Sequence, residues 1–232
     1  MKNIFLVDAD DTILDFHGAS AIALKTAFVE SGIAWEERYL AEFKKINGGL
    51  WEALERKELT RKELMDRRFH IFLQYLGLND IDADAFNKIF LEHLATHPIY
   101  IDGAEEFLTA IRKLGRVYIV TNGTAWIQKS RFDISNLWSY AEDVFVSDLI
   151  GFDKPAKAYT EYVVAHIPDF KKENAVWIGD SLSADIKAAN EADVMSIWYN
   201  RYQKEVIGNV IPDYNFSSFE EILSFLQRIN KN

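Results

Sequence analysis

The pattern of apolar and polar positions divides the chain into three stretches. Residues 4–7 form an unbroken apolar run, which is typical of a strand buried on both faces of a parallel sheet. Residues 17–95 carry apolar positions at helical spacing and contain no strand signal. From residue 96 onward, short apolar runs alternate with helical segments. This alternation predicts an α/β fold, in which a parallel sheet has helices on both faces.

The same pattern predicts the elements and the domains. Strands are expected at residues 4–7, 117–120, 144–146, 175–178 and 194–198. Helices before residue 96 are expected at 19–31, 36–46, 50–57, 61–76 and 84–95, and the Asn47-Gly48-Gly49 sequence should break the second from the third. We therefore predict an α/β domain of residues 1–16 and 96–232, with an inserted helical domain of residues 17–95.

Composition narrows the possible settings. The 232 residues carry a formal net charge of −10 at pH 7, which disfavours binding to a nucleic acid polymer. Cysteine is absent, so disulfides and thiolate metal sites are excluded. No apolar run reaches the length of a membrane span, and the first residues lead into acids instead of a signal peptide. We expect a cytoplasmic protein with no membrane partner and no nucleic acid partner.

Candidate chemistry begins where the first strand ends. Asp8, Asp10 and Asp11 follow the apolar run directly. In open α/β sheets, ligands bind at the carboxyl ends of the strands. Asp8 and Asp10 are two residues apart, so in extended backbone they would point the same way and repel each other. This pair of acids predicts a bound cation.

Later strands end in groups of complementary character. Thr121 follows the second predicted strand, and Asp180 follows the fourth, with Asp185 close behind it. Lys154 lies in the segment that leads to the fourth strand. Because the carboxyl ends of parallel strands share one edge, these residues would bring a hydroxyl, a cation and several carboxylates together. That set suits an anion, most simply phosphate.

Four motifs in this order resemble those of the haloacid dehalogenase superfamily. They are Asp8-Ala9-Asp10-Asp11-Thr12, Thr121-Asn122-Gly123, Lys154-Pro155 and Gly179-Asp180-Ser181-Leu182-Ser183-Ala184-Asp185. The four together are specific, whereas any one alone is weak evidence. The resemblance covers the whole chain. It implies a Rossmann-like core with an inserted helical-bundle cap, and the activity of a phosphatase.

The resemblance implies a role for each acid. Asp8 would be the nucleophile that forms an aspartyl-phosphate, and Asp10 would protonate the leaving oxygen and then deprotonate water. The carboxylates of Asp8 and Asp180 would hold Mg²⁺, together with the backbone carbonyl of Asp10. Asp185 would orient the surroundings of the metal.

The resemblance also implies how substrate is held. Thr121, Asn122 and Lys154 would bind phosphoryl oxygens. Asn47 and Trp51 in the helical domain combine an amide with an aromatic face, which suits a nucleobase. With the motifs, they make the chain similar to the pyrimidine 5′-nucleotidases, which hydrolyse UMP, dUMP, dTMP and non-standard pyrimidine monophosphates. The alternative is that Trp51 is core and Asn47 ends a helix.

Other functions stay open at this stage. A phosphatase of phosphoglycolate or of a sugar phosphate would share the motifs, as would a phosphomutase. A 2-haloacid dehalogenase shares the fold and nucleophile but needs neither a metal nor an acid at position 10. A phosphorylated receiver domain would be about half this length. Elsewhere, Asp82 is expected to cap a helix, and His93 and His97 are expected to be ordinary surface or hinge residues.

Overall fold

The structure, a computed structural model, describes residues 1–206 and 208–231. The chain folds into two compact units. The sheet unit consists of residues 1–16 and the described residues from 98 onward, and the helical unit consists of residues 17–97. In the described part of the chain, no helix has both the length and the apolar composition needed to cross a membrane.

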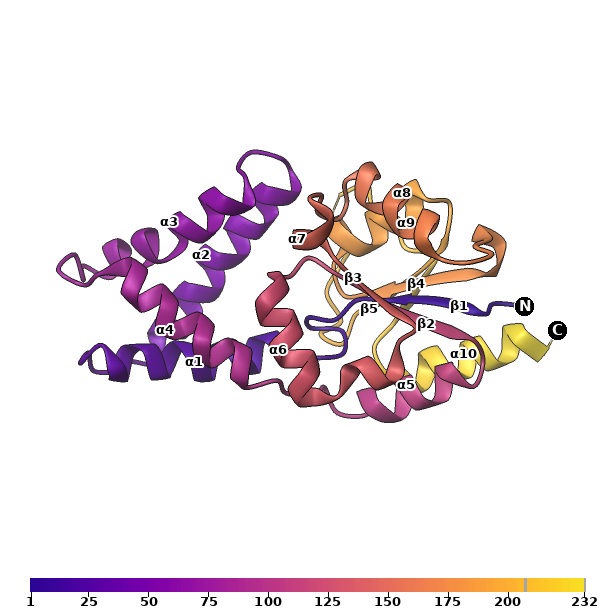
Figure 1. Ribbon diagram of the computed structural model, residues 1–232, viewed down its shortest axis with the longest axis horizontal. Helices are drawn as coiled ribbons and strands as arrows, with labels where there is room; N and C mark the ends of the chain where they lie inside the picture. Colours follow the sequence, from indigo (N-terminus) through magenta and orange to yellow (C-terminus); the bar gives the residue numbers. More distant parts are fainter. Residues whose placement is uncertain (207, 232) are drawn as a thin grey trace. The chain divides into compact units, whose positions relative to one another are not determined.

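Six parallel strands form the sheet unit in the described residues (Figure 1). They are β1 (Ile4–Val7), β2 (Arg116–Thr121), β3 (Asp143–Val146), β4 (Ala175–Gly179), β5 (Met195–Tyr199) and β6 (Tyr214–Phe216). Their order is β3-β2-β1-β4-β5-β6, and every neighbouring pair is parallel. The predicted parallel sheet is confirmed. β6 has no counterpart among the predicted strands, because this short edge strand carries no buried apolar run.

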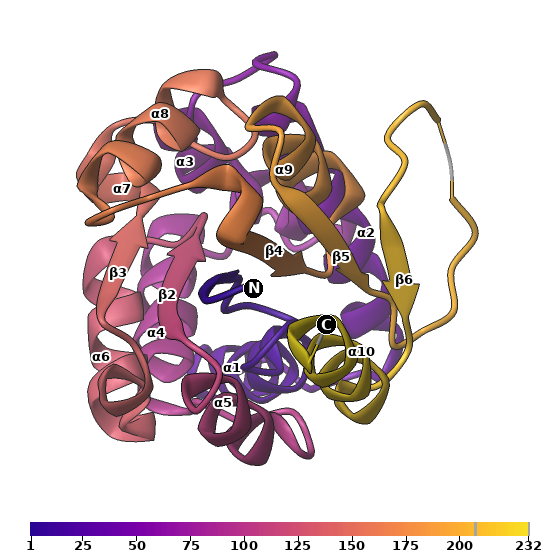
Figure 2. The same cartoon turned by 90° about the vertical axis from the view of Figure 1, so that its right-hand side faces the viewer.

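Helices cover both faces of this sheet (Figure 2). One face carries α5 (Ala104–Arg112), α6 (Ala125–Ser135) and α10 (Phe219–Lys231), and the other carries α8 (Lys157–His166) and α9 (Lys187–Glu191). The shorter helical segments are α7 (Ser147–Ile150), η1 (Leu137–Tyr140), η2 (Lys172–Asn174) and η3 (Leu182–Ile186).

The sheet separates two apolar layers, because successive side chains of a strand point to opposite faces. In β1, Phe5 and Val7 join the layer that contains α5 and α10. Ile4 and Leu6 join the layer that contains α8 and α9. All four side chains are buried. The unbroken apolar run in the sequence therefore reflects burial on both faces of the sheet.

The helical unit is formed by α1 (Phe16–Glu30), α2 (Arg38–Glu55), α3 (Arg61–Tyr75) and α4 (Ala83–Thr96). Its core is aromatic, with six buried phenylalanines in mutual contact: Phe28, Phe43, Phe69, Phe72, Phe86 and Phe90. Offset and edge-to-face ring pairs of this kind add specific packing energy to the burial of area. The predicted helical character of this stretch is confirmed.

Local capping sets the starts of two of these helices. Thr60 and Glu63 form a capping box at the start of α3. The Asp82 carboxylate accepts hydrogen bonds from the backbone N–H groups of Asp84 and Ala85 at the start of α4. Each side chain satisfies backbone donors that the first helical turn leaves unpaired, and the cap expected at Asp82 is confirmed.

The predicted helix break at Asn-Gly-Gly is wrong, because α2 is continuous across this sequence. Asn47 is 6% exposed, and its Oδ1 atom lies 3.5 Å from Arg68 Nη1 inside the helical unit. Gly48 and Gly49 have helical backbone, and a Cβ at either would meet nothing within 4 Å. Each glycine costs a helix about 1 kcal/mol relative to alanine. Packing of the buried face of α2 outweighs that cost.

Candidate active site

The carboxyl end of β1 lies where the strand order reverses. The chain forms β2 and β3 on one side of β1, and then continues with β4, β5 and β6 on the other side. In open α/β sheets, the crevice at such a point is where ligands bind. Asp8 directly follows β1, and its backbone N–H donates to the Ile178 carbonyl at 2.9 Å. This bond anchors the predicted nucleophile at the switch point.

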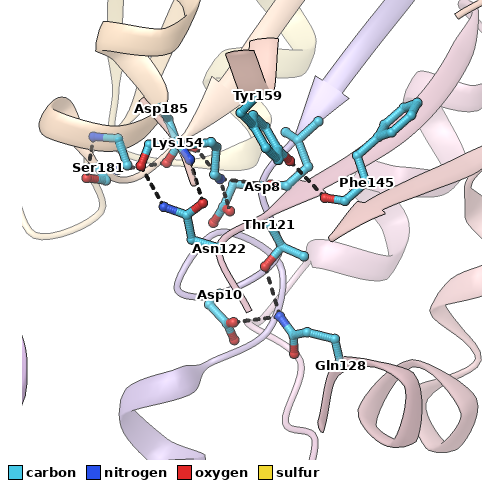
Figure 3. A network of polar contacts seen from close by, with 12 residues as sticks. Asp8, Asp10, Thr121, Asn122, Gln128, Phe145, Lys154, Tyr159, Ser181 and Asp185 are labelled. Carbon is cyan, nitrogen blue, oxygen red and sulfur yellow. Dashed lines mark hydrogen bonds and ion pairs between the residues drawn. The ribbon is translucent and has the colours of Figure 1, made fainter. Parts of the chain in front are cut away.

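One lysine joins two of the predicted acids (Figure 3). Lys154 Nζ lies 2.6 Å from Asp8 Oδ1 and 2.6 Å from Asp185 Oδ1. It also donates to the Val120 carbonyl at 2.8 Å. Lys154, Asp8 and Asp185 are each at most 5% exposed. The three hydrogen bonds use all three ammonium protons, so Lys154 holds both carboxylates in place.

Asn122 holds the segment that carries Lys154. Asn122 Nδ2 donates to the Lys154 carbonyl at 2.8 Å, and Asn122 Oδ1 accepts from the Lys154 backbone N–H at 2.7 Å. Both ends of this side-chain amide are therefore engaged with backbone (Figure 3). The structure shows Asn122 as a support for Lys154, and its contact with phosphate stays a prediction.

Three carboxylates converge beside this lysine. Asp8, Asp180 and Asp185 each have an oxygen within 4.8 Å of the other two. The Asp185 oxygens are both occupied, one by Lys154 and the other by the Ser181 backbone N–H at 3.2 Å. Among residues 1–206 and 208–231, no hydrogen-bond donor reaches Asp8 Oδ2 or the Asp180 carboxylate. These oxygens are the ones available to a cation.

A close backbone contact brings Asp185 into the cluster. Leu182–Ile186 forms a single π-helical turn, and the Ser181 hydroxyl accepts from the Ala184 N–H at 3.1 Å at its start. A Cβ atom on Gly179 would lie 2.3 Å from Asp185 Cγ. Only glycine fits at this position without a shift, because the Asp185 carboxyl packs against the end of β4.

Burial and mutual repulsion perturb these acids. Burial raises the pKa of Asp8 to about 8, with a further increase from Asp185, although the Lys154 ammonium opposes the change. Burial also raises the pKa of Asp180 well above its usual range, and the charges of Asp11 and Asp8 add to this effect. Burial disfavours the charge on Lys154, but Asp185 and Asp8 outweigh it and raise the pKa of the ammonium. The cluster carries more negative charge than one lysine offsets.

Asp10 has a different set of partners, from α6. Its Oδ1 atom lies 2.5 Å from Arg131 Nη1, and its Oδ2 atom accepts from Gln128 Nε2 at 2.8 Å. The same Nε2 group donates to Thr121 Oγ1 at 2.9 Å (Figure 3). Sequence reasoning missed Gln128 and Arg131. The signal was two polar residues three apart, which share one face of the helix that follows the Thr-Asn-Gly motif.

The two predicted specificity residues lie in the helical unit. Asn47 is buried in α2 and faces Arg68. Trp51 is half-buried, and the guanidinium carbon of Arg61 lies 5.5 Å from its ring centroid. The sequence predicted a helix break at Asn47-Gly48-Gly49, but Asn47 and Trp51 both lie within the continuous helix α2. Their contact with a substrate stays a prediction.

The three clustered carboxylates thus lie at the switch point of a parallel sheet. The model of the haloacid dehalogenase-like hydrolase family matches residues 2–193. The chain belongs to this family of hydrolases. The resemblance that the four sequence motifs predicted is thereby confirmed.

Individual relatives cover nearly the whole chain. It is 37% identical over 221 residues to the protein named "Putative HAD-hydrolase YfnB" of Bacillus subtilis (strain 168), a match that spans 95% of this chain and 94% of that protein. It is 32% identical over 224 residues to the pyrimidine 5′-nucleotidase PynA of Streptococcus pneumoniae (strain ATCC BAA-255 / R6), spanning 96% and 94%. A crystal structure of YfnB bound to magnesium matches with a TM-score of 0.92 and 36% identity, over 97% of this chain and 98% of that chain.

Proposed function

We propose that this protein is a Mg²⁺-dependent phosphomonoester hydrolase that works through a phosphorylated Asp8 and acts on pyrimidine nucleoside monophosphates. One observation carries the proposal. The Lys154 ammonium lies 2.6 Å from both Asp8 and Asp185, with the Asp180 carboxylate beside them. This arrangement orients Asp8 and leaves its second oxygen free of donors in the described residues.

The donor set fits Mg²⁺. Mg²⁺ prefers oxygen ligands and is commonly bound by one or two carboxylates together with substrate phosphate. Asp8 and Asp180 would hold the ion, with the Asp10 backbone carbonyl, while Asp185 would orient its surroundings. When bound, Mg²⁺ neutralises negative charge and orients a phosphoryl oxygen. The magnesium in the crystal structure of YfnB supports this assignment.

In the first step, an Asp8 oxygen attacks phosphorus, and the bond from phosphorus to the ester oxygen breaks. Asp10 gives its proton to that oxygen as the alcohol leaves. The Thr121 hydroxyl accepts a hydrogen bond from Gln128, so its own proton is available to a phosphoryl oxygen. Lys154 keeps Asp8 oriented and offsets charge in the transition state.

In the second step, Asp10 acts as a base. It takes a proton from water, and the water oxygen attacks the phosphorus bound to Asp8. The bond between phosphorus and the Asp8 oxygen breaks, so inorganic phosphate and free Asp8 are released. Asp10 ends the cycle protonated, ready to act as the acid again.

The substrate class rests on the helical unit and on one relative. PynA is a pyrimidine 5′-nucleotidase and is 32% identical to this chain. The Trp51 indole could stack on a nucleobase, and a base edge needs a hydrogen-bonding group such as an amide. Asn47 is the weaker candidate for that group, since its side chain already faces Arg68.

A phosphate-release assay with Mg²⁺ tests the proposal. UMP, dUMP and dTMP should be hydrolysed with higher kcat/KM than AMP, phosphoglycolate or a hexose phosphate. Better hydrolysis of phosphoglycolate or a hexose phosphate would reject the nucleotidase assignment and leave the phosphatase chemistry standing. Asp8→Asn should abolish turnover with the fold intact, whereas the exposed Asp84→Asn should not. Activity of Asp8→Asn would contradict the covalent mechanism.

Trp51 can be tested separately. Trp51→Ala should raise KM for dTMP more than KM for p-nitrophenyl phosphate, because only the nucleotide offers a base to stack. Tyr75→Ala removes an exposed aromatic ring from the same unit and is the matched control. Equal KM changes for both substrates would remove Trp51 from base recognition.

A further inference from the structure

Two buried side chains of α6 form a pair that reaches the predicted acid/base. Gln128 and Arg131 are each 1% exposed, and they lie three residues apart on one helical face. Arg131 Nη1 contacts Asp10 Oδ1 at 2.5 Å and Gln128 Oε1 at 2.9 Å. Gln128 Nε2 contacts Asp10 Oδ2 at 2.8 Å. The three side chains therefore form a closed ring of hydrogen bonds.

The chemistry of the partners settles the orientation of the Gln128 amide. A guanidinium only donates hydrogen bonds, so the end of the Gln128 amide that contacts Arg131 must be its oxygen. Gln128 Nε2 must therefore face Asp10, and Gln128 Oε1 must face Arg131. The second Nε2 proton then points to Thr121 Oγ1 at 2.9 Å. One amide thus sets the position of the acid/base and the direction of the hydroxyl that serves the phosphoryl group.

The Thr-Asn-Gly loop leaves Gln128 little freedom. A Cβ atom on Gly123 would lie 2.3 Å from Gln128 Cγ and 2.5 Å from its Nε2 atom. The Gln128 side chain therefore packs directly against the Gly123 backbone. This contact accounts for glycine as the third residue of the motif, since any larger residue would displace Gln128 from Asp10 and Thr121.

Arg131 is poorly suited to a purely structural role. Its Nε and Nη2 atoms are buried and have no hydrogen-bond partner in the described part of the chain. Unpaired buried donors cost free energy, and a buried ion pair adds little net stability compared with apolar packing. The retained arrangement is better explained by what it does for Asp10.

We propose that Gln128 and Arg131 are positioning residues that hold Asp10 in place for both proton transfers. This inference rests on the proposed function. Asp10 must reach the leaving oxygen in the first step and water in the second, from one location. Arg131 Nη1 contacts one Asp10 oxygen and Gln128 Nε2 contacts the other, so the side chain keeps one position through both steps.

Two aryl phosphates that differ in their leaving group separate positioning from other effects. p-Nitrophenolate leaves readily without a proton, whereas phenolate from phenyl phosphate gains much more from an acid. The quantity to measure is kcat/KM, because it reports the step in which the ester bond breaks. For Arg131→Met and Gln128→Leu, kcat/KM should fall about 10- to 100-fold more on phenyl phosphate than on p-nitrophenyl phosphate. Arg131→Lys keeps a cation and should recover part of the loss.

Lys129→Met is the matched control, since Lys129 lies on the same helix and its side chain is exposed. This variant should leave kcat/KM unchanged on both substrates. Circular dichroism and thermal unfolding establish which variants are folded. If Arg131→Met does not fold, Gln128→Leu provides the test, because the Gln128→Leu variant keeps the Asp10–Arg131 ion pair. An equal fall in kcat/KM on both esters, or no fall in a folded variant, would overturn the inference. The proposed function would still stand, because the wild-type protein hydrolyses the esters. A wild-type protein that hydrolyses neither ester would refute both.

Discussion

The Lys154 ammonium lies 2.6 Å from the Asp8 carboxylate, and both side chains are almost wholly buried. This contact joins residues that are 146 positions apart in the sequence. It restrains the proposed nucleophile through Oδ1, and no hydrogen-bond donor in the described residues reaches its Oδ2 atom. The same ammonium holds Asp185, so a single cation organises two of the three clustered carboxylates.

Removal of this cation should damage both stability and turnover. Lys154→Met leaves Asp8 and Asp185 buried without a counter-charge, so the free energy of unfolding should fall by about 3–5 kcal/mol. Turnover of p-nitrophenyl phosphate should fall at least about 100-fold, as for loss of one preorganised donor. Lys157→Met removes an exposed ion pair with Glu161 and is the control. Urea unfolding with chelator present measures the first effect, and unchanged stability would contradict the prediction.

The metal-free protein should lose stability as pH rises because of Asp180. Burial, with the charges of Asp11 and Asp8, raises the pKa of this carboxyl in the folded protein well above its usual range. Below the ordinary aspartate pKa of about 3.9, the carboxyl is protonated in both states and contributes nothing. Between that value and the higher folded-state pKa, the unfolded chain releases its proton while the folded protein still binds it, so stability falls as pH rises through this range. In chelator, the melting temperature should therefore fall less between pH 5 and pH 8 for Asp180→Asn than for the wild-type protein.

Mg²⁺ should reverse this loss. At pH 8 it should raise the melting temperature of the wild-type protein by mass action, and raise that of Asp180→Asn much less. Asp193→Asn is the control. The Lys172 hydrogen bond lowers the pKa of Asp193, so this carboxylate contributes to stability with the opposite dependence on pH. A wild-type melting temperature that is insensitive to Mg²⁺ would count against the metal site. So would full phosphatase activity in excess chelator.

Substitution of two glycines by alanine should change the stability of the protein in opposite directions. Gly179→Ala forces Asp185 to move, because the new Cβ would lie 2.3 Å from its Cγ atom. It should cost about 1–3 kcal/mol of stability, as overpacking does, and lower kcat/KM. Gly49→Ala meets nothing within 4 Å in the middle of α2, so it should stabilise the protein by about 1 kcal/mol. Thermal unfolding and phosphate release measure both, and a destabilised Gly49→Ala would indicate that α2 needs flexibility there.

Arg68, the buried arginine of the helical unit, contacts two amide side chains at different distances, so their contributions to stability should differ. Arg68 Nη2 lies 2.7 Å from Asn87 Oδ1, whereas Arg68 Nη1 lies 3.5 Å from Asn47 Oδ1. Burial lowers the pKa of Arg68 to about 9, so the guanidinium depends on these acceptors. Asn87→Ala should cost about 1–3 kcal/mol, the cost of an unsatisfied buried donor, and Asn47→Ala should cost less because its contact is long. Equal costs in thermal unfolding would contradict this ranking.

Much of the fold and of the acid site could be predicted from the order of residues alone. The run at Ile4–Val7 had to be a buried strand, because four consecutive apolar residues leave neither face for water. Alternation of later runs with helical segments required a parallel sheet, and Asp8, Asp180, Asp185 and Lys154 followed from motifs at its strand ends. The helix cap at Asp82 depends on local chemistry, and it too could be predicted from the sequence.

Only the tertiary structure decided which side chains are partners. Asn47 sits inside a continuous helix because burial beside Arg68 outweighs the local tendency of Asn-Gly-Gly to end one. Asp10 meets Gln128 and Arg131 across 118 and 121 positions, and no local pattern specifies such a contact. Propensity and periodicity act over a few residues, whereas the geometry of a site depends on how strands and helices pack together.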